Sequence, residues 1–317
     1  MMLRAADVAA ARALIAPYAA RTPCIRSPWL SAVTGHDVWL KLESLQPTHS
    51  FKVRGAACAV ARRSGAATRG FVTASAGNHG AALAHAARMA GVPVTVHAPR
   101  AAAAPKLDTI RRLGALLVAD YANYDEAEHA ALADASRTGA DYVSPYNDPD
   151  VICGQGTILL ETLDDVPACD AIVAPVGGGG LVSGLALAAS GLPRRIGIFG
   201  VEPERNPAFT DALREGRITT IPVLDTIADG LGGNIQPGSL TFGLVRDLGV
   251  RMSLAGEAAM ARAVCDAAEH DRLVVEGAAA AALAGVAGGA VAGAGLTVVV
   301  VVSGANIDRA KLAHLLA

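Results

Sequence analysis

One lysine of the chain lies within Ser50-Phe51-Lys52-Val53-Arg54-Gly55-Ala56, between an aromatic residue and a glycine-alanine pair that opens an apolar helix. A strand-like run, residues 38–42, and a turn containing Pro47 come before it. Apolar neighbours strip water from an ammonium group, which lowers its pKa and leaves the amine able to form a Schiff base. Most lysines are solvated surface charges, so this interpretation depends on the rest of the sequence.

Three further segments each follow an apolar, strand-like run. They are Ser75-Ala76-Gly77-Asn78-His79-Gly80, Gly177-Gly178-Gly179-Gly180-Leu181 and Ser303-Gly304-Ala305-Asn306. Glycine has no Cβ, so successive N–H groups of the second segment can approach one anion closely. The helix expected over residues 181–189 points its positive end at the same place, which predicts a binding site for a single phosphate.

A dinucleotide site is the main alternative interpretation of the four glycines. The segment lacks the G-x-G-x-x-G spacing typical of such sites. Glu202, however, lies near the distance at which an acid binds the ribose of NAD, so this alternative stays open from the sequence. A glycine-rich turn that binds no ligand is the third interpretation.

The composition bounds the class of protein. The chain has 317 residues, of which 52% are hydrophobic and 18% charged, which fits a globular protein and excludes broad disorder. Its net charge of -2 gives no basic face for nucleic acid. The five cysteines are scattered without C-x-x-C spacing, which favours reduced core residues in a cytoplasmic protein.

No membrane segment is expected. The start of the chain carries Arg4 and Asp7 and lacks the long apolar core of a signal peptide. Residues 277–302 carry no charge and are long enough to span a bilayer. They begin as an Ala/Gly-rich run and end in valines, a pattern that favours a buried helix followed by a buried central strand.

Strand-like runs alternate with helical ones along the chain, which predicts an α/β fold with mainly parallel sheets. The expected strands cover residues 70–75, 92–96, 115–118, 171–176, 196–201 and 298–302. Asp7 is placed to cap a first helix over about residues 8–18.

In their order and spacing, the four motifs resemble those of the fold-type II pyridoxal-phosphate enzymes. The resemblance runs from Arg21 to Asn306 and is to the serine/threonine dehydratase family, the branch of threonine ammonia-lyase and serine racemase. It implies a two-domain α/β fold like that of the tryptophan synthase β chain, with mainly parallel twisted sheets flanked by helices. A small domain, residues 66–146, would be inserted into a large cofactor-binding domain formed by residues 1–65 and 147–317. The cofactor would be pyridoxal 5′-phosphate, bound between the domains.

The resemblance also implies roles for individual residues. Lys52 would be the catalytic residue and would hold the cofactor covalently. The residues implied to bind the cofactor are Lys52, Phe51, Asn78, Gly177, Gly178, Gly179, Gly180, Leu181 and Ser303. The residues implied to bind the substrate are Ser75, Ala76, Gly77, Asn78 and His79. We expect His79 to pack against neighbouring backbone rather than to act as a general base.

The sequence departs from the family pattern at several positions. Ala76 stands where the racemases carry a second serine that protonates the opposite face of the substrate, and alanine has no proton to give. Glu202 is the only retained acid of a divalent-cation site, because Ala208 replaces the second one; no metal is expected unless Glu202 still holds one. Residues 144–147 differ from the family's His-Pro-Phe pattern and indicate an altered pocket or interface.

These features together favour a pyridoxal-phosphate-dependent ammonia-lyase that converts an L-β-hydroxy amino acid, with threonine or serine favoured, to a 2-oxo acid and ammonia. The alternatives are an amino-acid racemase, a dehydratase for hydroxyaspartate or another specialised substrate, a β-replacement synthase, and a metabolite-binding protein without chemistry. The chain ends about one short helix after Asn306, which favours a catabolic enzyme over one with a regulatory domain. The resemblance further implies a homodimer or homotetramer.

Overall fold

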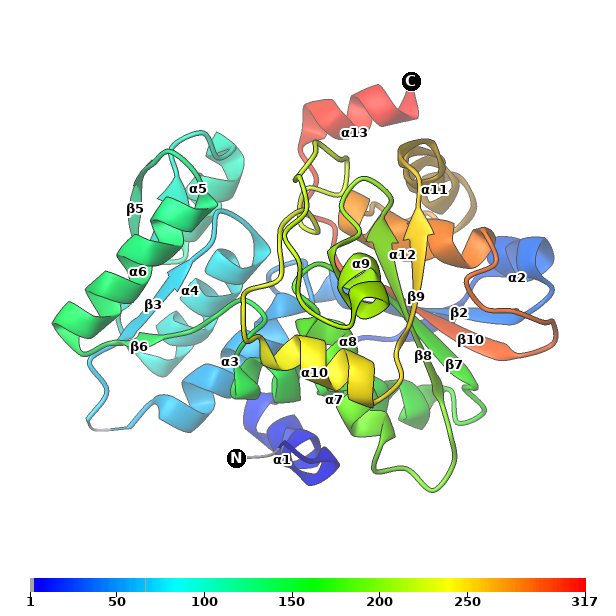
Figure 1. Ribbon diagram of the computed structural model, residues 1–317, viewed down its shortest axis with the longest axis horizontal. Helices are drawn as coiled ribbons and strands as arrows, with labels where there is room; N and C mark the ends of the chain where they lie inside the picture. Colours follow the sequence, from blue (N-terminus) through cyan, green and yellow to red (C-terminus); the bar gives the residue numbers. More distant parts are fainter. Residues whose placement is uncertain (1–2, 66) are drawn as a thin grey trace.

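The computed structural model describes residues 3–65 and 67–317 (Figure 1). One sheet has six strands in the order β1-β2-β10-β7-β8-β9, and its pairs are parallel except for β1 with β2. Its strands are β1 (Cys24–Arg26), β2 (Asp37–Leu42), β7 (Ala171–Pro175), β8 (Gly197–Pro203), β9 (Arg251–Ala255) and β10 (Thr297–Val302). Strands from both ends of the sequence therefore meet in one sheet.

A second sheet has four parallel strands in the order β5-β4-β3-β6. They are β3 (Phe71–Ala74), β4 (Val94–Pro99), β5 (Leu116–Tyr121) and β6 (Asp141–Tyr142), and they alternate with α4 (Asn78–Ala90), α5 (Ala104–Arg112) and α6 (Tyr124–Thr138). Figure 1 shows this unit beside the six-stranded sheet. We propose that it is the small inserted domain, residues 66–146; residue 66, like residues 1 and 2, lies outside the described part of the chain.

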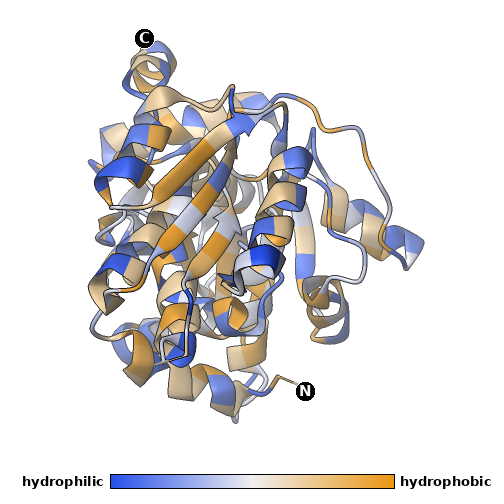
Figure 2. Ribbon diagram, turned by 90° about the vertical axis from the view of Figure 1, so that its left-hand side faces the viewer, coloured by the Kyte–Doolittle hydropathy of each residue, from blue (hydrophilic) through white to orange (hydrophobic). Residues whose placement is uncertain are grey.

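The remaining helices cover the two faces of the six-stranded sheet or pack on the helices that do so, as α1 and α13 do. They are α1 (Ala5–Ile15), α2 (Pro28–Thr34), α3 (Lys52–Arg63), α7 (Pro149–Asp165), α8 (Gly180–Ala189), α9 (Ala208–Glu215), α10 (Leu240–Asp247), α11 (Glu257–His270), α12 (Gly277–Ala287) and α13 (Arg309–Leu316), with a 3₁₀ turn η1 (Glu43–Leu45) after β2. In Figure 2 the strands facing the viewer are largely orange, whereas the helices around them carry both orange and blue residues. The apolar core therefore lies between the sheets and the helices.

The central strand β10 shows why the sheet is buried on both sides. Val299 and Val301 belong to the core under α3, α7 and α8, whereas Val298, Val300 and Val302 belong to the core under α11 and α12. Side chains alternate between the faces of a strand, so a strand covered on both sides needs an unbroken apolar run. The uncharged segment 277–302 accordingly contains α12 and β10, as predicted. Within the described residues, no helix is long and apolar enough to cross a membrane.

Candidate active site

Lys52 is the first residue of α3, and the segment before it lies beside the end of β10. The Phe51 N–H donates to the Ser303 carbonyl oxygen at 3.0 Å, and Ser50 forms an antiparallel bridge with Gly304. The Lys52 Nζ atom donates to the Pro145 carbonyl oxygen at 2.8 Å and lies 5.3 Å from the centre of the Phe51 ring. Three segments far apart in the sequence therefore meet around Lys52.

The electrostatic environment makes this amine unusually easy to deprotonate. Burial lowers the pKa of Lys52 to about 8, and the carboxylate of Glu276 opposes part of that shift. Of the four lysines in the sequence, Lys41 and Lys106 pair with carboxylates at 2.8 and 2.6 Å. Lys311 lies on α13 and donates to the Ile227 carbonyl oxygen at 2.8 Å. Lys52 is thus the lysine best suited to act as a nucleophile or base.

The loop from Ser75 to Gly77 connects β3 to α4 and faces the six-stranded sheet. The Ser75 hydroxyl accepts the Gly77 N–H at 3.2 Å. Asn78, the first residue of α4, donates its side-chain amide to both oxygens of Glu276 at 2.9 and 3.1 Å, and its Oδ1 accepts from Asn306 at 2.7 Å. This hydrogen-bonded cluster holds the N-terminus of α4 near Lys52, since the Glu276 charge also acts on the lysine.

Glu276 and Asn306 are polar residues of the site that were not among the predicted cofactor- or substrate-binding residues. Glu276 precedes α12 and is buried, which raises the pKa of its carboxyl group, while the Asn78 side chain opposes the shift. Its carboxylate lies so close to Gly304 that a Cβ there would come within 2.5 Å of Glu276 Oε1. An acid just before an alanine-rich helix was the available signal, but the sequence does not show that it contacts α4.

The environment of His79 does not suit it to transfer protons. It is buried, and its Nε2 hydrogen-bonds the Val143 carbonyl oxygen at 3.1 Å. Burial and the nearby Lys52 charge lower the pKa of His79 to about 3, so the ring is neutral at physiological pH. Its geometry supports a packing role.

Ala76 lies in the loop between β3 and α4. Its methyl side chain has no proton to donate.

The four glycines lie between β7 and the start of α8, and packing explains them as much as anion binding does. A Cβ on Gly178 would come within 2.2 Å of Tyr146 Cγ, and one on Gly179 within 2.4 Å of Phe209 Cζ. Gly179 also has φ +81°, a conformation that side chains rarely adopt. The sequence analysis favoured anion binding as the reason for the glycines and did not foresee these neighbours.

The loop nevertheless has the donors that an anion needs. None of the backbone N–H groups from Gly177 to Leu181 donates to an acceptor in the described part of the chain. Leu181 is buried in the first turn of α8, whose positive end lies at this loop. Consecutive free N–H groups at a helix N-terminus form a phosphate cradle.

Ser303 provides a second unsatisfied group. It follows β10 and is only 1% exposed, yet its Oγ has no hydrogen-bond partner among the described residues. Leaving a buried hydroxyl unpaired costs about 1–3 kcal/mol, so a ligand atom that hydrogen-bonds to Ser303 would relieve this cost. A hydroxyl can donate to a ring nitrogen, which is the role that the sequence analysis expects of Ser303.

Glu202 is occupied by a structural task. Its carboxylate accepts hydrogen bonds from the Phe209 N–H, the Thr210 N–H and the Thr210 hydroxyl at 2.7, 2.8 and 2.7 Å. It therefore caps α9, and burial raises the pKa of its carboxyl group. Three of the roughly four acceptor positions of the carboxylate are therefore occupied by the cap. In the described ranges no group of three or more His, Cys, Asp or Glu side chains is placed to hold a metal ion.

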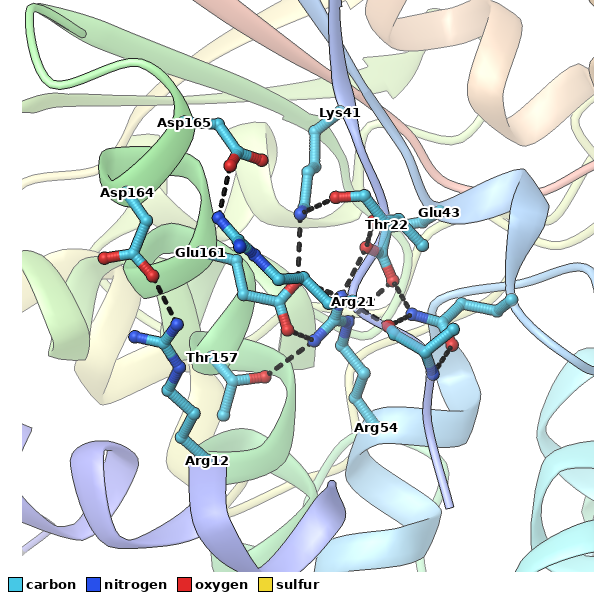
Figure 3. Close-up of polar contacts among 12 residues, drawn as sticks. Arg12, Arg21, Thr22, Lys41, Glu43, Arg54, Thr157, Glu161, Asp164 and Asp165 are labelled. Carbon is cyan, nitrogen blue, oxygen red and sulfur yellow. Dashed lines mark hydrogen bonds and ion pairs between the residues drawn. The ribbon is translucent and has the colours of Figure 1, made fainter. Parts of the chain in front are cut away.

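A buried ionic network is formed around Arg54 of α3 (Figure 3). The Arg54 guanidinium donates to Glu43 at 2.7 and 2.8 Å, to Glu161 at 2.8 and 2.7 Å, and to Thr157 at 3.2 Å. Lys41 donates to Glu161 at 2.8 Å. Arg54 is fully buried two residues after Lys52, so the network anchors the first turn of the helix that carries the lysine.

Comparison with known proteins agrees with this geometry. Residues 15–304 match the family described as "Pyridoxal-phosphate dependent enzyme". The L-threonine ammonia-lyase of Thermotoga maritima is 40% identical over 97% of this chain and 76% of that protein, and the beta-hydroxyaspartate dehydratase of Paracoccus denitrificans is 36% identical over 96% and 97%. The solved structure of maize serine racemase superposes with a TM-score of 0.93 at 33% identity, covering 99% of this chain and 97% of that one.

The site fits the cofactor of this family. Lys52 offers an amine with a lowered pKa, the loop from Gly177 to Leu181 offers unpaired N–H groups for a phosphate, and Ser303 offers a buried hydroxyl for a ring nitrogen. The comparisons confirm the predicted fold type and pyridoxal phosphate as the cofactor. This chain belongs to the family of pyridoxal-phosphate dependent enzymes.

Proposed function

We propose that this enzyme is an ammonia-lyase that converts an L-β-hydroxy amino acid, with threonine or serine favoured, to a 2-oxo acid and ammonia. The observation that carries the proposal is the Lys52 amine, with a pKa near 8, between the segment after β6 and the end of β10. Relatives named L-threonine ammonia-lyase at 39% and 40% identity support the choice of reaction.

Lys52 performs the proton transfer in this mechanism. When bound, pyridoxal phosphate draws electrons from the substrate Cα and so acidifies its proton. The amine of Lys52 removes that proton, because its lowered pKa leaves a useful fraction unprotonated near neutral pH. The Pro145 carbonyl oxygen, 2.8 Å from Nζ, aims the amine.

Other residues bind and orient. The Ser75 hydroxyl and the N–H groups at the start of α4 bind the substrate carboxylate, because a helix N-terminus favours negative charge. The Gly177–Leu181 N–H groups would bind the phosphate. Asn78 would hold the cofactor's phenolic oxygen, for which its side-chain amide must turn from the Glu276 carboxylate. Ser303 would donate to the ring nitrogen as a neutral partner, which would leave that nitrogen a weak electron acceptor and favour prompt loss of the β-hydroxyl group.

The test is release of ammonia and 2-oxo acid from L-threonine, L-serine and L-threo-3-hydroxyaspartate, measured separately with pyridoxal phosphate present. Equal amounts of both products from threonine or serine are expected. Hydroxyaspartate is included because a dehydratase for it is among the relatives. Release from hydroxyaspartate alone would retain the lyase and refute the substrate choice; release from none would refute the proposal.

A racemase is the second candidate, because the maize serine racemase shares the fold at 33% identity. Ala76 argues against it, since inversion needs a second proton donor on the face opposite Lys52. The Ala76→Ser variant is expected to form D-serine from L-serine at least about tenfold faster than the unmodified enzyme does. Chiral chromatography of the remaining serine measures it, and equal racemisation by both proteins would contradict this role of Ala76.

The lowered pKa of Lys52 predicts how the apoprotein takes up its cofactor. Below pH 8 the amine carries a proton and cannot attack an aldehyde, and above pH 8 it is free. The rate of covalent reconstitution with pyridoxal phosphate should therefore rise with pH and reach half its maximum near pH 8. Absorbance kinetics over a pH series give the midpoint, and a midpoint near the ordinary lysine value of 10.5 would contradict the described environment.

A homodimer or homotetramer and a cytoplasmic location complete the proposal. Light scattering after size-exclusion chromatography measures the first, and cell fractionation the second.

A further inference from the structure

The segment Ser144-Pro145-Tyr146-Asn147, which we call the return segment, connects β6 to α7 and contacts both the lysine and the glycine loop. Its Pro145 carbonyl oxygen accepts the Lys52 amine at 2.8 Å. The Ser144 hydroxyl accepts the Asn147 N–H at 3.1 Å, which fixes the turn between them. The return segment is also where the sequence departs from the family pattern, and the proposed reaction assigns no role to its aromatic residue.

Tyr146 lies directly against the glycine loop. Its ring is so close that a Cβ on Gly178 would come within 2.2 to 2.6 Å of three ring atoms. A Cβ on Gly180 would come within 3.0 Å of the Tyr146 Cα atom. The ring therefore requires a glycine at position 178, while Gly180 packs tightly against the Tyr146 backbone.

The ring is itself held in place by the segment before α10. The Tyr146 hydroxyl accepts the Gln236 N–H at 3.2 Å. The Asn147 side chain donates to Gln236 Oε1 and accepts the Leu240 N–H, both at 2.9 Å. Burial raises the pKa of the Tyr146 hydroxyl, so it stays neutral and able to make this contact.

The other side of the glycine loop is supported as well. Thr241 Oγ1 donates to the Gly178 carbonyl oxygen at 2.9 Å, and the Phe209 ring lies against Gly179. The loop is thus clamped between Tyr146 and a wall formed by Thr241 and Phe209. Because its own residues have no side chains, these neighbours determine the direction of its unpaired N–H groups.

We propose that Tyr146 is a positioning residue for the phosphate: its ring holds the Gly177–Gly180 loop in the conformation that binds the cofactor's phosphate group. A preorganised set of donors binds an anion more tightly than one that must be ordered on binding. The inference depends on the cofactor alone and not on which amino acid is the substrate. Its failure and the failure of the proposed lyase activity are therefore separate results.

The test compares two ligands on the apoprotein: pyridoxal phosphate, and pyridoxal, which has the same ring and aldehyde without the phosphate. Tyr146→Ala should raise the Kd of pyridoxal phosphate by about 10- to 100-fold, the range found when a residue that supports a metal ligand is removed. The Kd of pyridoxal should change by less than about threefold, since Lys52 and Ser303 are untouched. Tyr146→Phe keeps the ring and should stay within about threefold of the unmodified protein for both ligands.

Tyr121→Ala is the matched control, because Tyr121 lies on β5 and its hydroxyl contacts His97 at 2.8 Å, away from the glycine loop. It should leave both Kd values unchanged. Should Tyr146→Ala fail to fold, as judged by circular dichroism, Tyr146→Leu is measured against the same expectations with a smaller effect. Unchanged affinity for pyridoxal phosphate in the variant that folds would overturn the proposal, as would equal weakening of both ligands.

Discussion

Replacing Lys52 with alanine should reduce the release of 2-oxo acid by at least about a thousandfold while leaving the protein folded. The variant loses both the covalent attachment of the cofactor and the base that takes the Cα proton. None of the other lysines can replace it: Lys41 is buried against Glu161, Lys106 is paired with Asp229, and Lys311 lies on α13.

The measurement is initial-rate formation of 2-oxo acid from L-threonine at saturating cofactor. Arg100→Ala is the control and should retain the rate of the unmodified enzyme, because it removes an exposed cation that pairs with Asp120. The fold of both variants is checked by circular dichroism and thermal unfolding. Lys52→Ala with the full rate would remove the basis of the mechanism.

Arg54→Met should lower the free energy of unfolding by about 3–5 kcal/mol, the largest stability effect that we expect from a single substitution. The guanidinium neutralises Glu43 and Glu161. These carboxylates are 0% and 6% exposed, so solvent cannot stabilise their charges in its place. The Arg54 charge lowers the pKa of Glu161 against the effect of burial. Methionine leaves one cation, Lys41, for two buried carboxylates.

Urea unfolding of the apoproteins gives the free energies without the contribution of bound cofactor. Arg100→Met is the matched control: Arg100 also pairs with a carboxylate, that of Asp120, but their side chains are 71% and 78% exposed. An exposed pair contributes at most about 1 kcal/mol, so this variant should differ little from the unmodified protein. Similar losses of unfolding free energy in the two variants would show that the stabilisation by the Arg54 network does not depend on its burial.

The network also bears on catalysis, because α3 starts without strong capping. Phe51 stands at the N-cap position and offers no side-chain hydrogen bond, while the Lys52 N–H reaches the Ser50 hydroxyl only at 3.4 Å. Gly154 fits against the Arg54 carbonyl oxygen, where a Cβ would come within 2.4 Å. Arg54 and this close helix contact therefore hold the first turn in place of a cap.

The sequence predicted the parts of the fold that have long, uniform patterns. The valines of β10 and the strand before the four glycines are buried on both faces and lie where expected. Shorter strands were missed: β1 and β6 have three and two residues, too few to show alternation. β9 was missed as well, because it lies at the sheet edge and its burial pattern is mixed, with Arg251 exposed.

The first helix shows how a local rule can misplace a boundary. Asp7 was expected to cap a helix that begins after it, but α1 begins at Ala5. Asp7 is inside the first turn, where its carboxylate accepts the Arg4 N–H at 2.8 Å. An acid is favourable both at the cap and within the first turn, so its identity does not fix the start.

The site was predictable where a motif is continuous in sequence and was not where segments meet. The lysine motif and the glycine motif are each continuous in sequence, so both could be recognised there. The contact between Asn78 and Glu276 joins residues 198 positions apart, and that between Arg54 and Glu161 joins residues 107 apart. Tyr146 was visible only as a departure from a family pattern, since its importance lies in the glycines that it touches.

Mapping the covalent attachment of the cofactor tests the central claim most directly. The protein, loaded with pyridoxal phosphate, is reduced with borohydride, digested and analysed by mass spectrometry. Because the sequence has only four lysines, each falls on a distinguishable peptide. Our account predicts one phosphopyridoxyl group per chain, on Lys52; a label on Lys41, Lys106 or Lys311, or none at all, would contradict it.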